Sequence, residues 1–131
     1  MITLLLADDQ ITARTGLRLR LSLEPDIKIV AEAGDGREAV LLATKLRPQV
    51  VLMDIRMPTM SGLEAAAILR TAVPQTAVIL TTMYPTATAR AEATAVGAAA
   101  FIPKQSDPQA LLAAIRRAAA ATENSDTQSE S

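Results

Sequence analysis

One acid ends an otherwise apolar stretch in the middle of the sequence. The run 50–53 predicts a strand buried on both faces, and Asp54 follows it directly. Two more acids, Asp8 and Asp9, follow the apolar run 2–7 in the same way. Three carboxylates that share a small site repel each other, and a divalent cation removes this conflict. Because oxygen ligands without histidine or cysteine favour a hard ion, we expect a Mg²⁺ site.

Two further apolar runs end near residues with hydroxyl or ammonium groups, which could take part in the same reaction. One ends on Thr81 and Thr82, and the other is followed closely by Lys104. A carboxylate such as Asp54 can attack phosphorus and form an aspartyl phosphate. The phosphoryl group spreads its charge over three oxygens, which Mg²⁺, Lys104 and a threonine hydroxyl or backbone N–H can stabilise. These residue types therefore point to phosphoryl transfer.

Each residue also has an ordinary structural interpretation. Asp8 and Asp9 fit a turn and a helix N-cap, Asp54 fits a loop acid, and Thr82 fits a buried strand end. Lys104 is by default a solvated lysine. The occurrence of all of them at the ends of four predicted strands favours one shared site.

Five alternating pairs of strand and helix are predicted to position these side chains. The expected strands are 2–7, 27–33, 50–53, 77–82 and 99–102, and the expected helices are 12–23, 37–46, 61–72, 86–96 and 107–120. Ser61 is a plausible N-cap with Glu64 three residues later, and Gly97 is a plausible helix end. The alternation predicts an α/β doubly wound parallel sheet with helices on both faces. We expect the flavodoxin-like (βα)5 arrangement with strand order 2-1-3-4-5, in which the first, third, fourth and fifth strands are neighbours. Ligands bind outside the carboxyl ends of such strands.

Composition excludes several other kinds of site. The chain has 131 residues, the size of one domain, and contains no histidine and no cysteine. Zinc sites with thiolate or imidazole ligands, disulfides and Ser-His triads are therefore excluded. The formal charge of −1 argues against a nucleic-acid surface. No apolar run reaches the ~18 residues of a membrane span, and the start lacks a signal-peptide pattern, so we expect a cytoplasmic protein.

Four stretches carry a family resemblance. LLLADDQ, VVLMDIRMPTMSGLEA, VILTTMYP and GAAAFIPK resemble, in order, the signatures of bacterial two-component response-regulator receiver domains. The resemblance covers roughly residues 2–120. The family's spacing, counted back from Lys104, selects Thr82 rather than Thr81 as the signalling residue. Counted forward from Thr82, it selects Phe101 as the switch aromatic.

The resemblance implies a role for each matching residue. Asp54 would be the phosphoacceptor, and Lys104 would pair with the phosphoryl group. Asp9 would bind Mg²⁺ directly, with Asp8 helping mainly through water and Arg56 contributing its backbone carbonyl. The remaining two roles concern the switch: on phosphorylation Thr82 would swing toward the phosphate, and Phe101 would move inward.

Weaker similarities suggest a branch of the family and an output. PDIKIVAEAGDGREAV, MDIRMP and TMY resemble the NarL/FixJ branch, whose members usually add a C-terminal LuxR-type helix-turn-helix domain. The resemblance implies a transcription regulator that contacts DNA only through that domain, which is missing here. Residues 1–121 are expected to be the receiver domain. Residues 122–131 are expected to be a disordered acidic tail or the start of an interdomain linker.

Partners follow from the same resemblance. The phosphoryl donor would be a sensor histidine kinase, expected to dock near the first helix, whose outer face is expected to carry Arg14 and Arg18. The first and last helices are a candidate homodimer surface, because the last is rich in alanine. The receiver supports its own phosphoryl transfer and slow hydrolysis of the aspartyl phosphate, so it is not expected to be a turnover enzyme.

Other functions remain open at this point. The chain can be a stand-alone receiver, a phosphorelay protein or a pseudo-receiver that only binds partners. A phosphatase of the haloacid dehalogenase type would also use an aspartate nucleophile and Mg²⁺, but it needs a second acid where Arg56 stands. A flavodoxin-type flavin carrier needs a hydroxyl-rich loop after the first strand, where this chain has Asp8 and Asp9.

Overall fold

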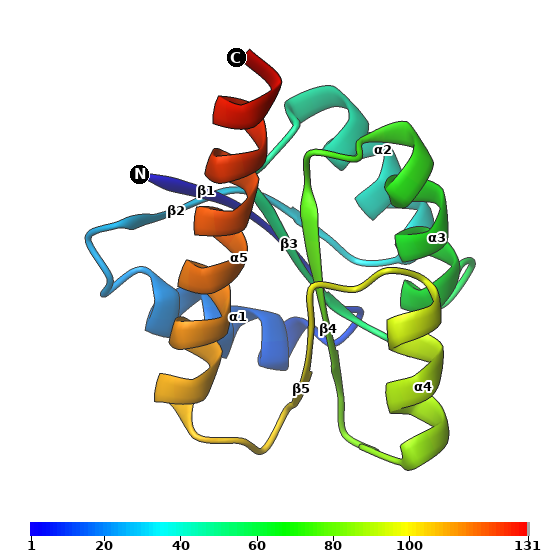
Figure 1. Cartoon of the computed structure of the whole chain (residues 1–131). Coiled ribbons are helices and arrows are strands. Elements are labelled where there is room, and N and C mark those ends of the chain that lie inside the picture. The colour runs from blue at the N-terminus through cyan, green and yellow to red at the C-terminus, as the bar shows by residue number, and fades with distance from the viewer. Residues whose placement is uncertain (131) are drawn as a thin grey trace.

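A five-stranded parallel sheet forms the middle layer of the protein, with helices on both faces (Figure 1). The computed structural model describes residues 1–130. The strands are β1 (Ile2–Ala7), β2 (Ile27–Ala33), β3 (Val50–Asp54), β4 (Ala77–Thr82) and β5 (Ala100–Pro103). The helices are α1 (Ile11–Leu21), α2 (Gly36–Leu46), α3 (Gly62–Ala72), α4 (Ala87–Ala95) and α5 (Pro108–Glu130).

The strand order is β2-β1-β3-β4-β5, and all four pairings are parallel. This confirms the predicted α/β fold and its strand order. The chain runs outward from β1 to β2 and then returns past β1 to β3, so the winding direction reverses between β1 and β3. Ligands in such folds bind at this reversal, outside the carboxyl ends of the strands. Asp8 and Asp9 follow one of these two strands, and Asp54 ends the other.

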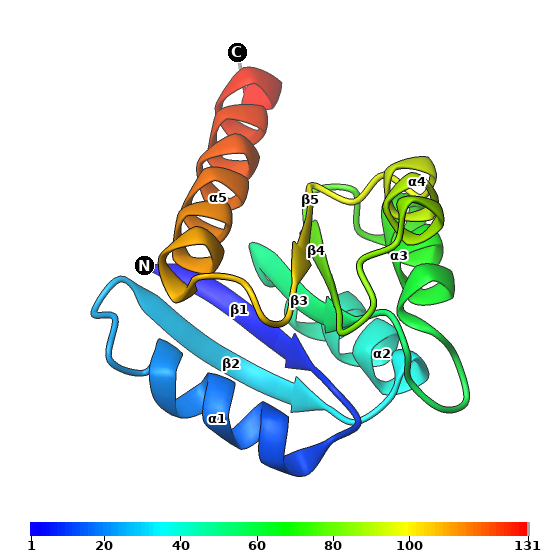
Figure 2. The same ribbon diagram turned by 90° about the horizontal axis from the view of Figure 1, so that it is seen from below.

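Two hydrophobic cores cover the two faces of the sheet. One contains Leu4, Leu6 and Leu52 of the strands and Ile115 of α5. The other contains the intervening strand residues, among them Leu5, Val51 and Met53, together with small residues of α2, α3 and α4. Because successive strand residues point to opposite faces and both faces are buried, the central strands β1, β3 and β4 are largely apolar runs, whereas the edge strand β2 carries Lys28 and Glu32. Figure 2 shows α1 and α5 on one side and α2, α3 and α4 on the other.

Side-chain caps set the starts of three helices. Ser61 Oγ accepts a hydrogen bond from the N–H of Glu64, as predicted for α3. Asp35 caps α2 by accepting from the N–H of Glu38, and Thr86 caps α4 by accepting from the N–H of Ala89. Gly97 has φ of +82° after α4, which confirms it as the left-handed residue that ends this helix.

The last helix is longer than the sequence predicted. α5 continues to Glu130, whereas the sequence analysis ended this helix at 120. The difference arises because the alanines before 122 are strong helix formers and extending a helix needs no new nucleus. Residue 131 lies outside the described residues. The division into a receiver domain (1–121) and a linker stays a prediction. Within residues 1–130, no helix has the length and apolar character that a membrane crossing requires.

Candidate functional site

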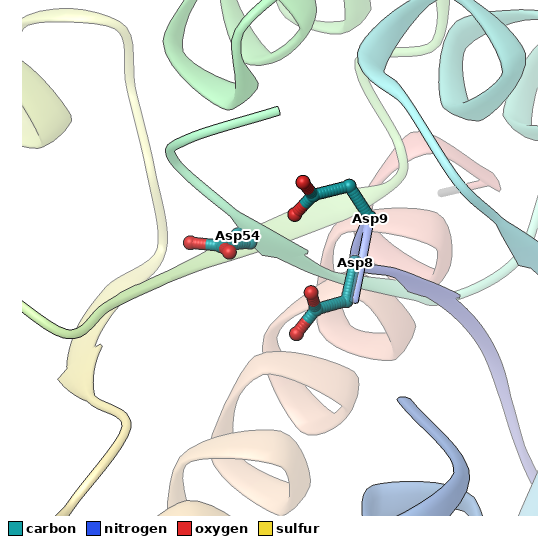
Figure 3. A group of neighbouring side chains, drawn as sticks. All are labelled: Asp8, Asp9 and Asp54. Atoms are coloured by element: carbon teal, nitrogen blue, oxygen red, sulfur yellow. The ribbon is translucent and has the colours of Figure 1, made fainter. Parts of the chain in front are cut away.

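Three carboxylates meet at the carboxyl ends of β1 and β3. One ligand oxygen from each of Asp8, Asp9 and Asp54 lies within 4.8 Å of the others. Figure 3 shows the three carboxyl groups pointing to the same side of the sheet edge. Asp8 and Asp54 are buried, with 2% and 7% of their surface exposed, whereas Asp9 is exposed. The predicted convergence of the three acids is therefore present in the fold.

Lys104 joins two of these acids. Its Nζ donates to Asp8 Oδ2 at 2.8 Å and to Asp54 Oδ2 at 2.9 Å. Lys104 directly follows β5, and its backbone N–H donates to the carbonyl of Thr82 at 2.9 Å. This backbone bond anchors the lysine to β4, and its side chain extends from the end of β5 to the acids at the ends of β1 and β3. The ammonium is thus a counterion shared by two buried carboxylates.

Burial and charge act in opposite directions on these groups. Burial raises the pKa of Asp54 above its ordinary value, although the hydrogen bond and charge of Lys104 oppose this. For Lys104, burial lowers the pKa, but the hydrogen bonds and charges of Asp8 and Asp54 outweigh it and the net direction is upward. Lys104 therefore stays charged at neutral pH. Burial disfavours the charged form of the Asp54 carboxyl in the folded protein.

The backbone after Asp54 turns back sharply against its own strand. Gly62 donates its N–H to the carbonyl of Ile55 at 2.7 Å, and Ile55 N–H donates to Thr81 at 2.9 Å. A Cβ on Gly62 would lie 2.2 Å from the Asp54 carbonyl oxygen, so only glycine fits there. Thr59, in the same turn, has φ of +69°, a strained conformation for a β-branched residue. This turn therefore holds the end of β3 in place.

The two predicted switch residues lie on β4 and β5. Thr82 is buried, with 3% of its surface exposed, and its hydroxyl accepts from the N–H of Tyr84 at 3.0 Å. Thr81, rather than Thr82, is the register partner of Asp54. Phe101 is partly buried, and the guanidinium of Arg90 lies 4.8 Å from its ring centre. The switching roles of Thr82 and Phe101 stay predictions.

Arg56 makes a contact that the sequence analysis missed. Its backbone N–H lies 3.4 Å from Asp54 Oδ1. Its guanidinium stacks 4.5 Å from the ring centre of Tyr84, across the site from β3 to the loop after β4. The expected role of its backbone carbonyl as a metal ligand stays a prediction. The Arg56–Tyr84 stack could not be found from local sequence, because it depends on the sheet register and on the direction of both side chains.

The interpretation of Arg14 as an outer-face residue was wrong. Its Nη1 donates to the carbonyls of Asp8 at 2.7 Å and Ala33 at 3.3 Å, and its Nε donates to Glu32 Oε1 at 3.1 Å. The side chain is only 21% exposed. The sequence did contain a signal: Leu17 and Leu21 lie three and seven residues later, on the same inward face of the helix.

These groups form a cluster of three carboxylates and one lysine at the reversal of a 2-1-3-4-5 sheet, and the carboxylate oxygens could hold a metal ion. A model of the response regulator receiver domain matches residues 4–116, and the chain belongs to this family. Its relatives include response regulators of the NarL and LuxR type.

Named relatives agree with this assignment. The chain is 38% identical over 118 residues to the transcriptional regulatory protein YxjL of Bacillus subtilis. The aligned region covers 90% of this chain and 54% of that protein. It is 37% identical over 115 residues to the nitrate/nitrite response regulator protein NarP of Escherichia coli, covering 88% and 54%. The chain therefore spans about half the length of the curated relatives that it matches.

A solved structure supports the fold in the same way. A two-component response regulator of the LuxR family from Aurantimonas sp. superposes with a TM-score of 0.88 at 30% identity. The match covers 92% of this chain and 86% of that one. The chain is thus the receiver domain of a two-component response regulator.

Proposed function

We propose that Asp54 accepts a phosphoryl group from a phosphohistidine of a sensor kinase. The observation that carries this proposal is the buried Asp54 carboxylate held by Lys104 beside Asp8 and Asp9. In this step an Asp54 oxygen forms a bond to phosphorus while the P–N bond to histidine breaks. The bonding electron pair stays on the imidazole nitrogen of the donor, and Lys104 is placed to pair with a phosphoryl oxygen.

The acid cluster suits a Mg²⁺ ion. Asp9 and Asp54 would bind it directly, with Asp8 acting mainly through water and the Arg56 carbonyl as a further ligand. The fit rests on the oxygen-only donors and their separations below 4.8 Å. Bound Mg²⁺ supplies positive charge to the phosphoryl oxygens during transfer. The chain's own contribution is to orient Asp54, and to exclude water from it by burial.

A small phosphoryl donor tests this function directly. Wild-type protein incubated with acetyl phosphate and Mg²⁺ is expected to gain one phosphoryl group in the intact mass spectrum, and none when EDTA replaces Mg²⁺. Beryllofluoride, which mimics the phosphoryl group, should bind at the same site. Protein that shows neither the adduct nor a response to beryllofluoride would be a pseudo-receiver.

The output of the full protein is proposed from its relatives. Because YxjL and NarP are named as regulatory proteins and are about twice as long, we propose a LuxR-type DNA-binding domain beyond this receiver. DNA contacts would then come from that domain, and the regulator would work in the cytoplasm. A stand-alone receiver is the alternative, and the length of the natural protein distinguishes the two. The receiver itself would undergo phosphorylation and slow hydrolysis without being a turnover enzyme.

The kinase would dock over α1 and the loop between β5 and α5. A cavity of about 280 Å³ lies there, lined by Asp8 and Lys104 of the site and by Leu17 and Arg20 of α1. Ile11, the first residue of α1, leaves 69% of its surface exposed. An apolar, partly charged entrance next to Asp54 suits a helix that must bring a phosphohistidine to this carboxylate.

Arg90 is expected to hold Phe101 in its resting position. A stacked cation at a partly exposed site is worth about 0.5–1 kcal/mol, so losing it favours the inward position roughly 2- to 5-fold. We expect Arg90→Met to bind beryllofluoride tighter by that factor in calorimetry, with Arg117→Met as an exposed control. Equal affinities for Arg90→Met and wild type would contradict this role. The same change in a Phe101→Leu background should have no effect.

A homodimer through α1 and α5 stays a prediction. Arg116 of α5 is already paired within the chain, with Asp26 at 2.9 Å and Glu24 at 2.7 Å, so it braces α5 against the turn after α1. This ion pairing lowers the pKa of Asp26. Sedimentation with and without beryllofluoride tests the dimer: we expect a shift to twice the mass on activation, and a monomer under both conditions would refute it.

A further inference from the structure

Arg14 contacts the backbone of the loop that carries Asp8 and Asp9. Its guanidinium donates through Nη1 to the Asp8 carbonyl at 2.7 Å and to the Ala33 carbonyl at 3.3 Å. Its Nε donates to Glu32 Oε1 at 3.1 Å. Arg14 therefore ties the end of β1 to the end of β2, just where the chain leaves the sheet for Asp9.

The bonded carbonyl belongs to the peptide unit that joins Asp8 to Asp9. Fixing this oxygen fixes the plane of that peptide, because the peptide bond is rigid. Asp8 is also held by three further bonds: its N–H donates to the carbonyl of Ala33, its Oδ1 accepts from the N–H of Gln10, and its Oδ2 accepts from Lys104. Asp9 is exposed, so its direction depends on the backbone that Arg14 holds.

An arginine suits this position for a chemical reason. The planar guanidinium presents donors in a fixed fork, so it can bind a carbonyl through one nitrogen and a carboxylate through another. Glu32 orients the fork by accepting from Nε. A lysine ammonium lacks this fixed geometry and would hold the Asp8 carbonyl less firmly.

We propose that Arg14 is a positioning residue for the Mg²⁺ site, acting by holding the Asp8–Asp9 peptide so that Asp9 faces the ion. This inference rests on the Mg²⁺ site of the proposed function. Arg14 touches no reacting atom in it. Groups that hold metal ligands from behind typically change metal affinity 10- to 100-fold when they are removed.

A matched control is present one helical turn further along. Arg18 also binds Glu32, through Nη1 to Oε2 at 3.1 Å, but it is 46% exposed and lies beyond the loop. Arg18→Met removes an ion pair to the same acid, whereas Arg14→Met also removes the bonds to the two carbonyls. Comparing the two variants separates the loop contacts from the loss of a charge near Glu32.

The test is a titration of the full chain with Mg²⁺, in which the backbone NMR signals report the binding affinity. We expect Arg14→Met to bind Mg²⁺ about 10-fold more weakly than wild type, and Arg18→Met to stay within about 2-fold. Glu32→Gln, which leaves the carbonyl bonds of Arg14 in place, should also stay near wild type. The melting temperature in EDTA is measured for each variant, so that a general loss of stability is recognised.

Each outcome is decisive. Equal Mg²⁺ affinity in Arg14→Met and wild type overturns the inference, even if the melting temperature falls. An equal loss in Arg14→Met and Arg18→Met also overturns it, because charge alone would then explain the effect. If Arg14→Met does not fold, Arg14→Lys replaces it, and wild-type affinity in that variant refutes the inference. Wild-type protein that binds no Mg²⁺ refutes the proposed metal site instead.

Discussion

Asp54→Asn is expected to form no Mg²⁺-dependent phosphoryl adduct with acetyl phosphate. The amide that replaces the carboxylate keeps the shape of the side chain but lacks the anionic oxygen that attacks phosphorus. We expect the adduct to fall at least about 100-fold, below detection in the intact mass spectrum. Digestion of the phosphorylated wild type should place the group on the peptide that contains Asp54.

The melting temperature of Asp54→Asn shows whether this variant is still folded. The pKa of Asp54 is raised in the folded protein, mainly by burial. A raised carboxyl pKa means that the folded state holds a proton more tightly than the unfolded state, so the stability of the fold falls as the pH rises from the unfolded pKa through the folded pKa. Asp54→Asn should therefore melt at a higher temperature than wild type at pH 7 in EDTA, and at a similar one at acidic pH.

A control variant at a second acid distinguishes phosphorylation of Asp54 from nonspecific labelling of carboxylates. Asp107 lies near the start of α5, where its Oδ1 accepts from the N–H of Gln109. Asparagine caps helices as well as aspartate does, so Asp107→Asn should fold and be phosphorylated like wild type. Retention of the adduct in Asp54→Asn would show that another side chain is the acceptor.

Among the proposed variants, Lys104→Met is expected to lower the free energy of unfolding of the metal-free protein the most. The variant leaves Asp8 and Asp54 buried without the ammonium that both now accept from. Breaking a fully buried pair costs about 3–5 kcal/mol. Because the cluster opens to solvent at Asp9, we expect a lower cost of about 2–3 kcal/mol in the free energy of unfolding. Urea unfolding at pH 7 in EDTA measures it.

Added Mg²⁺ gives this prediction its specific signature. A divalent cation would replace the missing positive charge, so Mg²⁺ should stabilise Lys104→Met by more than it stabilises wild type. Lys45→Met, on the exposed part of α2, should lose under about 0.5 kcal/mol and show the wild-type response to Mg²⁺. A loss in Lys104→Met no larger than in Lys45→Met would mean that the lysine is not a needed counterion.

The strand-end residues were predictable because two simple patterns coincide in this chain. Strands buried on both faces are continuous apolar runs, so the polar residue that ends each run marks the sheet edge. Asp54 and Asp8 are found in this way, and parallel winding brings their strand ends to one edge. The strand order followed from the alternation of strands and helices together with the resemblance to a known family.

Contacts between distant segments were harder to predict. The Arg56–Tyr84 stack and the Arg90–Phe101 stack join residues from different elements, and their distances depend on register and on side-chain direction. The continuation of α5 to Glu130 was missed for another reason, because polar composition alone does not decide whether an existing helix stops.

By itself, the sequence determined the doubly wound fold, the edge at which the site lies, and the set of acids and lysine that meet there. These depend on local patterns, namely buried apolar runs and the polar residues that end them. Only the tertiary structure decided that Lys104 bridges Asp8 and Asp54, and that Arg14 turns inward to hold the Asp8 carbonyl. Such contacts are set by how β1, β2, β3 and β5 pack together, and no local stretch of sequence contains that information.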